Sequence, residues 1–323
     1  MRKYCIALIG VAVSLSIVGA AQGQQFPISG KPIRIVVPFA VGGGADTQAR
    51  VVAQSIAETL GVSVIVDNKP GASSVIGTRE VQRAAPDGHT LLYTIGTIVQ
   101  VPLLSRRPPW NVFTDFTPIT TAVRSSAVLT AHVSAPFNTL PELITYAKAN
   151  PGKLSYASFG TGSTSHLNGE NLKRRAGIEI VHVPYKGAGE LMRDQLSGSV
   201  ILAFDGPTTA MVNVQSGLVK FIAIAAETRS AATPDVPTLR EHGYDIGRRG
   251  YNWFFGPPGM PPAIVDAIYS HIAKAVARPE VKGTFEKVGN EAIALTPTEM
   301  AAEVQRTHDY WVPIIRELGV TLD

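Results

Sequence analysis

Two glycine-rich segments of the chain have the residue types and spacing that bind anions. Residues 36–46 and 156–166 each run from an apolar stretch through a glycine loop into a helical pattern. Glycine lets a ligand reach the backbone without a Cβ in the way. The first turn of a helix has unpaired N–H groups and a partial positive charge, so both segments are candidate anion sites. If they face each other across one cleft, they suit a carboxylate, or a dicarboxylate with one charge at each side.

Short polar side chains could add hydrogen bonds to such a site. Asp46 is either a favourable acid in a first helical turn or an acceptor that fixes the loop or meets an amine on the ligand. His166 either caps and packs its helical turn or contacts the ligand. Asp205 follows an apolar strand and is either a helix cap or a pocket acceptor. Hydroxyl donors in the second segment are Ser158, Thr161, Ser163, Thr164 and Ser165.

Enzyme chemistry is disfavoured by what the motifs lack. No lysine follows either glycine loop in the spacing of a P-loop, and no G-x-S-x-G elbow is present. The seven histidines form no close pair of metal ligands. Ser165 and His166 are neighbours at the start of one helix, so their side chains do not face each other as a catalytic pair. We therefore expect no catalytic residue, no metal and no cofactor.

The elements that must position the two loops alternate between strand and helix. Residues 33–37 and 62–66 have strand-like patterns, and the apolar spacing predicts a helix over residues 46–60 between them. The pattern begins again with a strand at residues 154–157 and a helix over residues 164–176. Such alternation predicts an α/β fold with parallel sheets and right-handed crossovers.

Length and the N-terminal segment set the organisation of the chain. A length of 323 residues predicts two lobes rather than one core. Residues 1–23 combine a positive start, an apolar run and small residues, which predicts a cleaved secretory signal peptide. Its removal takes away Cys5, the only cysteine, so the mature chain has no disulfide and no thiolate. The loss of Arg2 and Lys3 lowers the formal charge from +4 to +2. A charge this small does not indicate a nucleic-acid-binding protein.

Several motifs follow one another in order along the mature chain. They are Lys31-Pro32-Ile33-Arg34, Val36-Val37-Pro38-Phe39, Gly42-Gly43-Gly44-Ala45-Asp46, Asn68-Lys69-Pro70-Gly71-Ala72, and residues 85–92, 160–167, 182–187 and 234–239. In this combination the sequence resembles the Bug family of periplasmic receptors, the binding components of tripartite tricarboxylate transporters. One departure is Ala40-Val41, where many relatives have a small residue and a second glycine. The larger Val41 is expected to narrow the pocket.

The resemblance implies a particular fold and a particular set of ligand contacts. The fold would be a two-domain periplasmic binding protein of type II, a Venus flytrap in which each domain is a mostly parallel sheet flanked by helices. Residues 24–124 and 228–323 would form domain 1, and residues 125–227 domain 2. Carried over from the family, the expected ligand-binding residues are Phe39, Ala40, Gly43, Gly44, Ala45, Asp46, Thr47, Gly96, Thr97, Ser158, Gly160, Thr161, Gly162, Ser163, Thr164, Ser165, His166 and Asp205.

The resemblance also implies partners and a location. We expect a small organic anion as ligand, either a mono- or a dicarboxylate, and the integral membrane subunits of a transporter as partners. The receptor is expected to be a monomer in the periplasm, with no role for nucleic acid. Two alternatives stay open, namely a sensory protein that docks to a receptor kinase and a periplasmic enzyme on the same architecture.

Overall fold

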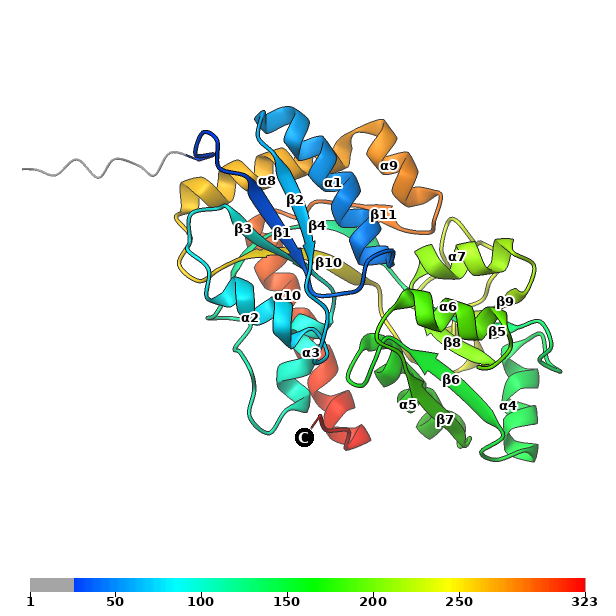
Figure 1. Ribbon diagram of the computed structural model, residues 1–323. Helices are drawn as coiled ribbons and strands as arrows, with labels where there is room; N and C mark the ends of the chain where they lie inside the picture. The colour runs from blue at the N-terminus through cyan, green and yellow to red at the C-terminus, as the bar shows by residue number, and fades with distance from the viewer. Residues whose placement is uncertain (1–25, 323) are drawn as a thin grey trace, which may run out of the picture.

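The computed structural model describes residues 26–322, which form two lobes (Figure 1). The predicted signal peptide, residues 1–23, lies outside the described residues. Each lobe is a β-sheet with helices packed against it. Over residues 26–322, no helix is both long and apolar enough to cross a bilayer.

The first lobe is built on a six-stranded sheet with the strand order β11-β4-β10-β3-β1-β2. β1 pairs in parallel with β2 and β3, whereas β10 runs antiparallel to β3 and β4. Alternate side chains of β1 enter different cores, with Ile35 on one face and Val36 on the other. The strands are β1 (Ile33–Val37), β2 (Val64–Asn68), β3 (Thr90–Thr94), β4 (Thr117–Ser125), β10 (Gly250–Gly256) and β11 (Glu291–Ala292).

Helices cover both faces of this sheet. The apolar spacing of Ala49, Val52 and Ile56 turns one stripe of α1 toward the sheet, and Gly61 ends this helix in the left-handed conformation. One face carries α1 (Gly44–Leu60), α8 (Pro262–Ala277) and α9 (Pro279–Glu286), and the other carries α2 (Val75–Gln82), α3 (Thr97–Leu104) and α10 (Pro297–Leu318). The helix predicted over residues 46–60 is confirmed and begins two residues earlier.

The second lobe is built on a five-stranded sheet with the strand order β7-β6-β8-β5-β9. β6 pairs in parallel with β7 and β8, whereas β5 is antiparallel to β8 and β9. The strands are β5 (Ala127–His132), β6 (Leu154–Ser158), β7 (Ile180–Pro184), β8 (Leu202–Asp205) and β9 (Val219–Ala225). One face carries α4 (Leu140–Ala149) and α5 (Thr164–Ala176), and the other carries α6 (Ala188–Leu196) and α7 (Pro207–Gln215).

The predicted α/β fold of a two-lobed binding protein is confirmed, but the sheets are mixed rather than mostly parallel. A parallel neighbour needs a crossover connection over the face of its own sheet. β10 instead arrives from the second lobe and therefore enters the first sheet against the direction of β3. β5 likewise enters the second sheet directly from β4 and runs against β8.

The chain passes between the lobes at two places, which bear on the domain boundaries. The first passage lies between Ser125 at the end of β4 and Ala127 at the start of β5. After β9 the chain stays on the second lobe, where Leu239 and Ile246 are buried in its core around the short helix η1 (Arg240–His242). We therefore propose that the return to the first lobe lies near residues 247–250 rather than at the predicted residue 228.

Candidate functional site

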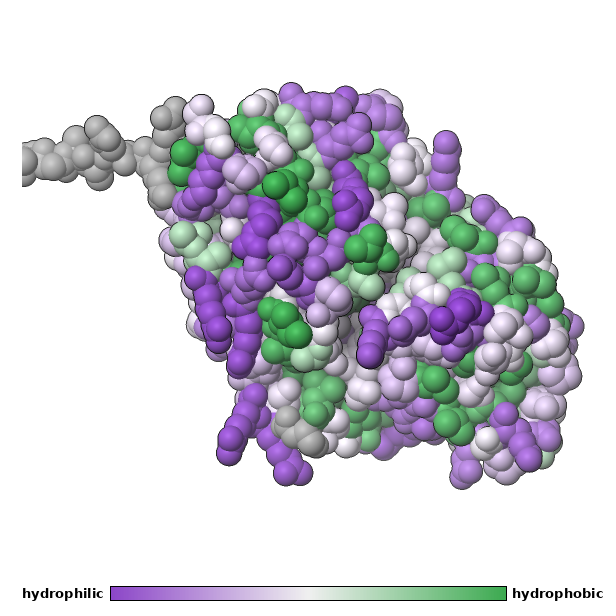
Figure 2. Space-filling view, viewed as in Figure 1, coloured by the Kyte–Doolittle hydropathy of each residue, from purple (hydrophilic) through white to green (hydrophobic). Residues whose placement is uncertain are grey.

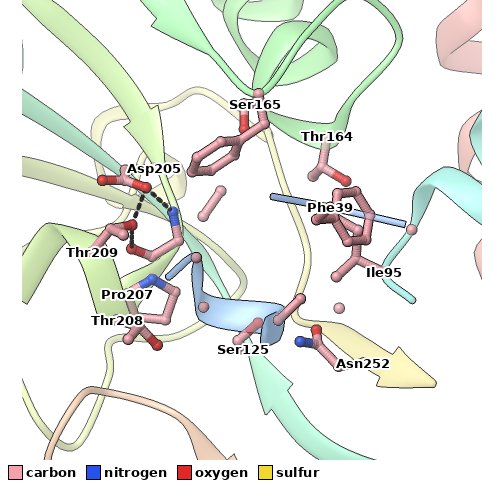
Figure 3. Close-up of a pocket in the computed structure, with 18 of the residues that line it drawn as sticks. Phe39, Ile95, Ser125, Thr164, Ser165, Asp205, Pro207, Thr208, Thr209 and Asn252 are labelled. Atoms are coloured by element: carbon pink, nitrogen blue, oxygen red, sulfur yellow. Dashed lines mark hydrogen bonds between the residues drawn. The ribbon is translucent and has the colours of Figure 1, made fainter. Parts of the chain in front are cut away.

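A cavity of about 180 Å³ lies between the two lobes. The surface is indented where the lobes meet (Figure 2). Around the cavity, Phe39 and Ile95 stand on one side, and Asp205 and Thr208 stand on the other (Figure 3). The two polypeptide passages between the lobes also reach it, through residues 125–127 and 248–253.

Five helices begin at the wall of this cavity. In the first lobe, Gly43 precedes α1 and Gly96 precedes α3. In the second lobe, the lining includes Thr164 at the start of α5, Gly187 before α6 and Gly206 before α7. Each helix start contributes free N–H groups and a partial positive charge, so both lobes present an anion-binding surface to the same space.

Charged side chains at the cavity are mostly basic. Lys186, Arg248 and Arg249 line it, and Asp205 is the single acid among the lining residues. Arg248 is paired with Glu303 at 2.6 Å. The Nζ of Lys186 has no ion pair within the described chain, so its charge is available at the exposed edge of the cavity.

Asp205 ends β8 and is almost completely buried, with 1% of its surface exposed. One carboxylate oxygen accepts hydrogen bonds from the Gly206 N–H at 2.7 Å and from the Thr209 hydroxyl (Figure 3). The second oxygen has no partner. Burial raises the pKa of Asp205 to about 7. Asp205 therefore anchors the loop that leads into α7, but Gly206 is the N-cap of this helix and no side chain caps it. Of the two roles expected from sequence, the structure does not support the helix cap, and acceptance of a hydrogen bond from a ligand stays a prediction.

The raised pKa of Asp205 predicts a pH dependence of stability. An unfolded aspartate loses its proton near pH 4, whereas the buried group holds its proton up to about pH 7. The folded state therefore binds more protons between these values, and the free energy of unfolding falls as pH rises through this window, by up to about 4 kcal/mol. Asp205→Asn should flatten this decline in urea unfolding measured from pH 4 to pH 8. An unchanged pH profile would contradict the buried, protonated state.

Half of the residues predicted from sequence stand at the cavity wall. The lining includes Phe39, Ala40, Gly43, Gly44, Ala45, Gly96, Thr164, Ser165 and Asp205. The first glycine loop therefore faces the cavity along most of its length, whereas the second contributes only Phe159 and the beginning of α5. Contact of these residues with a ligand stays a prediction.

The other half does not line this cavity, and contact of these residues with a ligand also stays a prediction. Asp46 accepts a hydrogen bond from Gly42 and pairs with Arg50, so it fixes its own loop. The Nδ1 of His166 accepts a hydrogen bond from the Gly162 N–H, and the ring of His166 stacks on His182. The residues that do not line the cavity are Asp46, Thr47, Thr97, Ser158, Gly160, Thr161, Gly162, Ser163 and His166.

Gly162 shows why the second loop turns away from the cavity. Its φ is 82°, which favours glycine, and an added Cβ would lie 2.8 Å from Leu104 of the first lobe. Ser163 caps α5 by accepting a hydrogen bond from the His166 N–H. These residues shape the loop and its contact with the first lobe, so we expect substitutions at Gly162 to act on stability and lobe packing.

Sequence reasoning missed a second group of lining residues. They are Gln48, Ile95, Ser125, Ser126, Ala127, Phe159, Tyr251, Asn252, Trp253, Asn290, Thr307 and Trp311. Gln48 could have been found, because it lies one helical turn after Gly44 and shares its face. Phe159 lies inside the second glycine-rich segment, and the others belong to no motif. Residues 125–127 and 251–253 reach the cavity because the chain passes between the lobes there. Thr307 and Trp311 reach it from α10.

The two lobes also bond to each other directly around the cavity. The side chains of Gln100 in α3 and Thr164 in α5 are joined by a hydrogen bond of 2.8 Å. The Ser73 hydroxyl donates to the Thr161 carbonyl at 3.0 Å, and Asn290 donates to the Thr208 hydroxyl at 2.9 Å. The lobes are therefore held in a closed arrangement with the cavity between them.

The described residues contain no cluster of three or more histidine, cysteine, aspartate or glutamate side chains able to hold a metal ion. The cavity offers amide donors, hydroxyls, cations and aromatic walls, which suit binding of an anion with an apolar body.

Comparisons with known proteins agree with this geometry. The family model described as the tripartite tricarboxylate transporter family receptor matches residues 48–320. The protein BugT of Bordetella pertussis is 32% identical, with 98% of each chain covered. A structure from R. palustris with adipate has a TM-score of 0.87 at 28% identity, covering 92% of this chain and 99% of the other. MatC from Rhodopseudomonas palustris with bound malate has a TM-score of 0.82 at 29% identity, covering 89% and 100%.

Proposed function

Because this chain belongs to the tripartite tricarboxylate transporter family of receptors, we propose that it captures a small carboxylate between its lobes and delivers it to the membrane subunits of such a transporter. The family consists of solute-binding receptors and not of enzymes. The proposal concerns the carboxylate ligand, the transporter partner and release of the mature chain into the periplasm.

The convergence of five helix starts on one closed cavity carries this proposal. Three of them belong to the second lobe and two to the first, so a bound anion would draw the lobes together. Lys186 adds a positive charge that is unpaired among the described residues, whereas Arg248 and Arg249 are paired with Glu303 and Glu291. The one lining acid, Asp205, is held protonated up to about pH 7 by its burial. Two similar proteins hold adipate and malate, which are both carboxylates.

Titration calorimetry of the mature chain against organic acids tests the proposal. The panel should include mono- and dicarboxylates of four to six carbons and aromatic acids, each with its neutral methyl ester as a matched control. We expect at least one acid to bind while its ester does not, because the helix starts need a negative charge. Ligand at 100 times its Kd should stabilise the fold by about 2.7 kcal/mol.

Uptake measurements test the transport step separately. Cells that lack this chain should lose uptake of the radiolabelled acid found by calorimetry and regain it on complementation. Failure of every acid to bind, or uptake that does not depend on the chain, would contradict the proposed function.

A further inference from the structure

The wall contributed by the first lobe contains two buried amide side chains. Gln48 in α1 and Asn252 in β10 both line the cavity, with only 5% and 6% of their surfaces exposed. They are 204 positions apart in sequence and are joined by a hydrogen bond between their amide groups. The Asn252 side chain lies across the cavity from Thr164 and Ser165 of the second lobe (Figure 3).

Tyr93 fixes the orientation of this pair. Its ring is fully buried, and burial raises the pKa of the Tyr93 hydroxyl far above the usual value, so the hydroxyl remains a donor. The Tyr93 hydroxyl donates to Gln48 Oε1 at 3.0 Å, and Asn252 Nδ2 donates to the same oxygen. If the Gln48 amide were reversed, the buried hydroxyl would lose its acceptor, which costs about 1–3 kcal/mol.

This orientation leaves one donor group and one acceptor for the cavity. Gln48 Nε2 and Asn252 Oδ1 take part in no hydrogen bond with the described residues. Neither atom is among the fully enclosed polar atoms that lack a partner, so both keep some accessible surface. Because both residues line the cavity, that surface faces the ligand space.

We propose that Gln48 and Asn252 bind a neutral carboxamide group of the ligand. The helix starts of the second lobe would hold the carboxylate of the same ligand. A carboxamide has one oxygen to accept from Gln48 Nε2 and N–H groups to donate to Asn252 Oδ1. A second carboxylate has no hydrogen to donate and would place its negative charge against the Asn252 oxygen. The inference rests on the proposed function and narrows its ligand to the monoamide of a dicarboxylic acid.

Matched pairs of ligands test this inference by calorimetry at pH 7.5. Succinate, glutarate and adipate are each compared with their own monoamide, which has the same length and one charge fewer. We expect the best monoamide to bind roughly 10- to 100-fold more tightly than its dicarboxylate, because the latter leaves a buried acceptor unpaired.

Substitutions at the pair show whether it is the origin of this preference. Asn252→Leu and Gln48→Met keep the side-chain size but remove the polar groups. In each variant the affinities for a monoamide and for its dicarboxylate should differ by no more than about threefold. Tyr93→Phe leaves both amides in place but removes the hydroxyl that orients Gln48, and should reduce the preference in part. Gln82→Met is the control, because Gln82 bonds to Asp115 and is not part of the cavity wall.

The outcomes separate the inference from the proposed function. The proposed carboxamide binding would be wrong if dicarboxylates bind as tightly as their monoamides, or if the preference remains in the Asn252→Leu protein. Either result would still agree with the proposed function as a carboxylate receptor. Binding of neither acid nor monoamide would overturn both.

Discussion

Gly187→Val is expected to weaken binding of the cognate carboxylate by at least about 100-fold, which corresponds to about 2.8 kcal/mol. Gly187 precedes α6 in the second lobe, and an added Cβ would lie 2.7 Å from the Cβ of Ala40 in the first lobe. The φ of −174° at Gly187 is open to any residue, so valine does not strain the loop itself. The substitution should therefore keep the lobes apart and remove the contacts that need closure.

Calorimetry and solution scattering together check this expectation. The Gly187→Val protein should show no compaction on addition of ligand, while its melting temperature without ligand stays near that of the wild type. Gly189→Val is a matched control two positions along, because an added Cβ there meets no atom within 4 Å. Normal affinity in the Gly187→Val protein would show that binding does not need the close approach of these two loops.

Gly169→Ala is expected to destabilise the fold by about 2 kcal/mol, although alanine is the better helix former. Gly169 lies inside α5, and an added Cβ would overlap the ring of Tyr156. That ring is fully buried, and its hydroxyl donates to Glu170 at 2.7 Å, so it has little room to move. Overpacking costs about 1–3 kcal/mol, which outweighs the gain of about 1 kcal/mol in helix propensity.

A second glycine provides the control of opposite sign. Gly283 lies inside α9, where an added Cβ meets nothing within 4 Å, so Gly283→Ala should stabilise the fold by up to about 1 kcal/mol. Urea unfolding of both variants measures the difference. If Gly169→Ala instead stabilises the fold, the expected overpacking is wrong, and α5 and the Tyr156 ring move apart at little cost. Because α5 begins at the cavity, a shift of this helix should also lower ligand affinity.

Local sequence determined most of the secondary structure. The spacing of Ala49, Val52 and Ile56 produces α1, and Thr296 with Glu299 forms the capping box that begins α10. The glycine loop before α1 indicated an anion-binding surface, and residues 39–45 of that loop stand at the cavity, apart from Val41 and Gly42. Signals of this kind are readable because neighbouring residues alone decide them.

Tertiary structure decided which of these residues face the ligand space. The two glycine loops have similar sequences, yet Gly43 and Gly44 line the cavity while Gly160 and Gly162 do not. Gly162 instead turns toward Leu104, a contact that joins two lobes and has no local signal. In the same way, Gln48 and Asn252 meet only because α1 packs on the sheet that contains β10, so distant segments built the part of the wall that we expect to select the ligand.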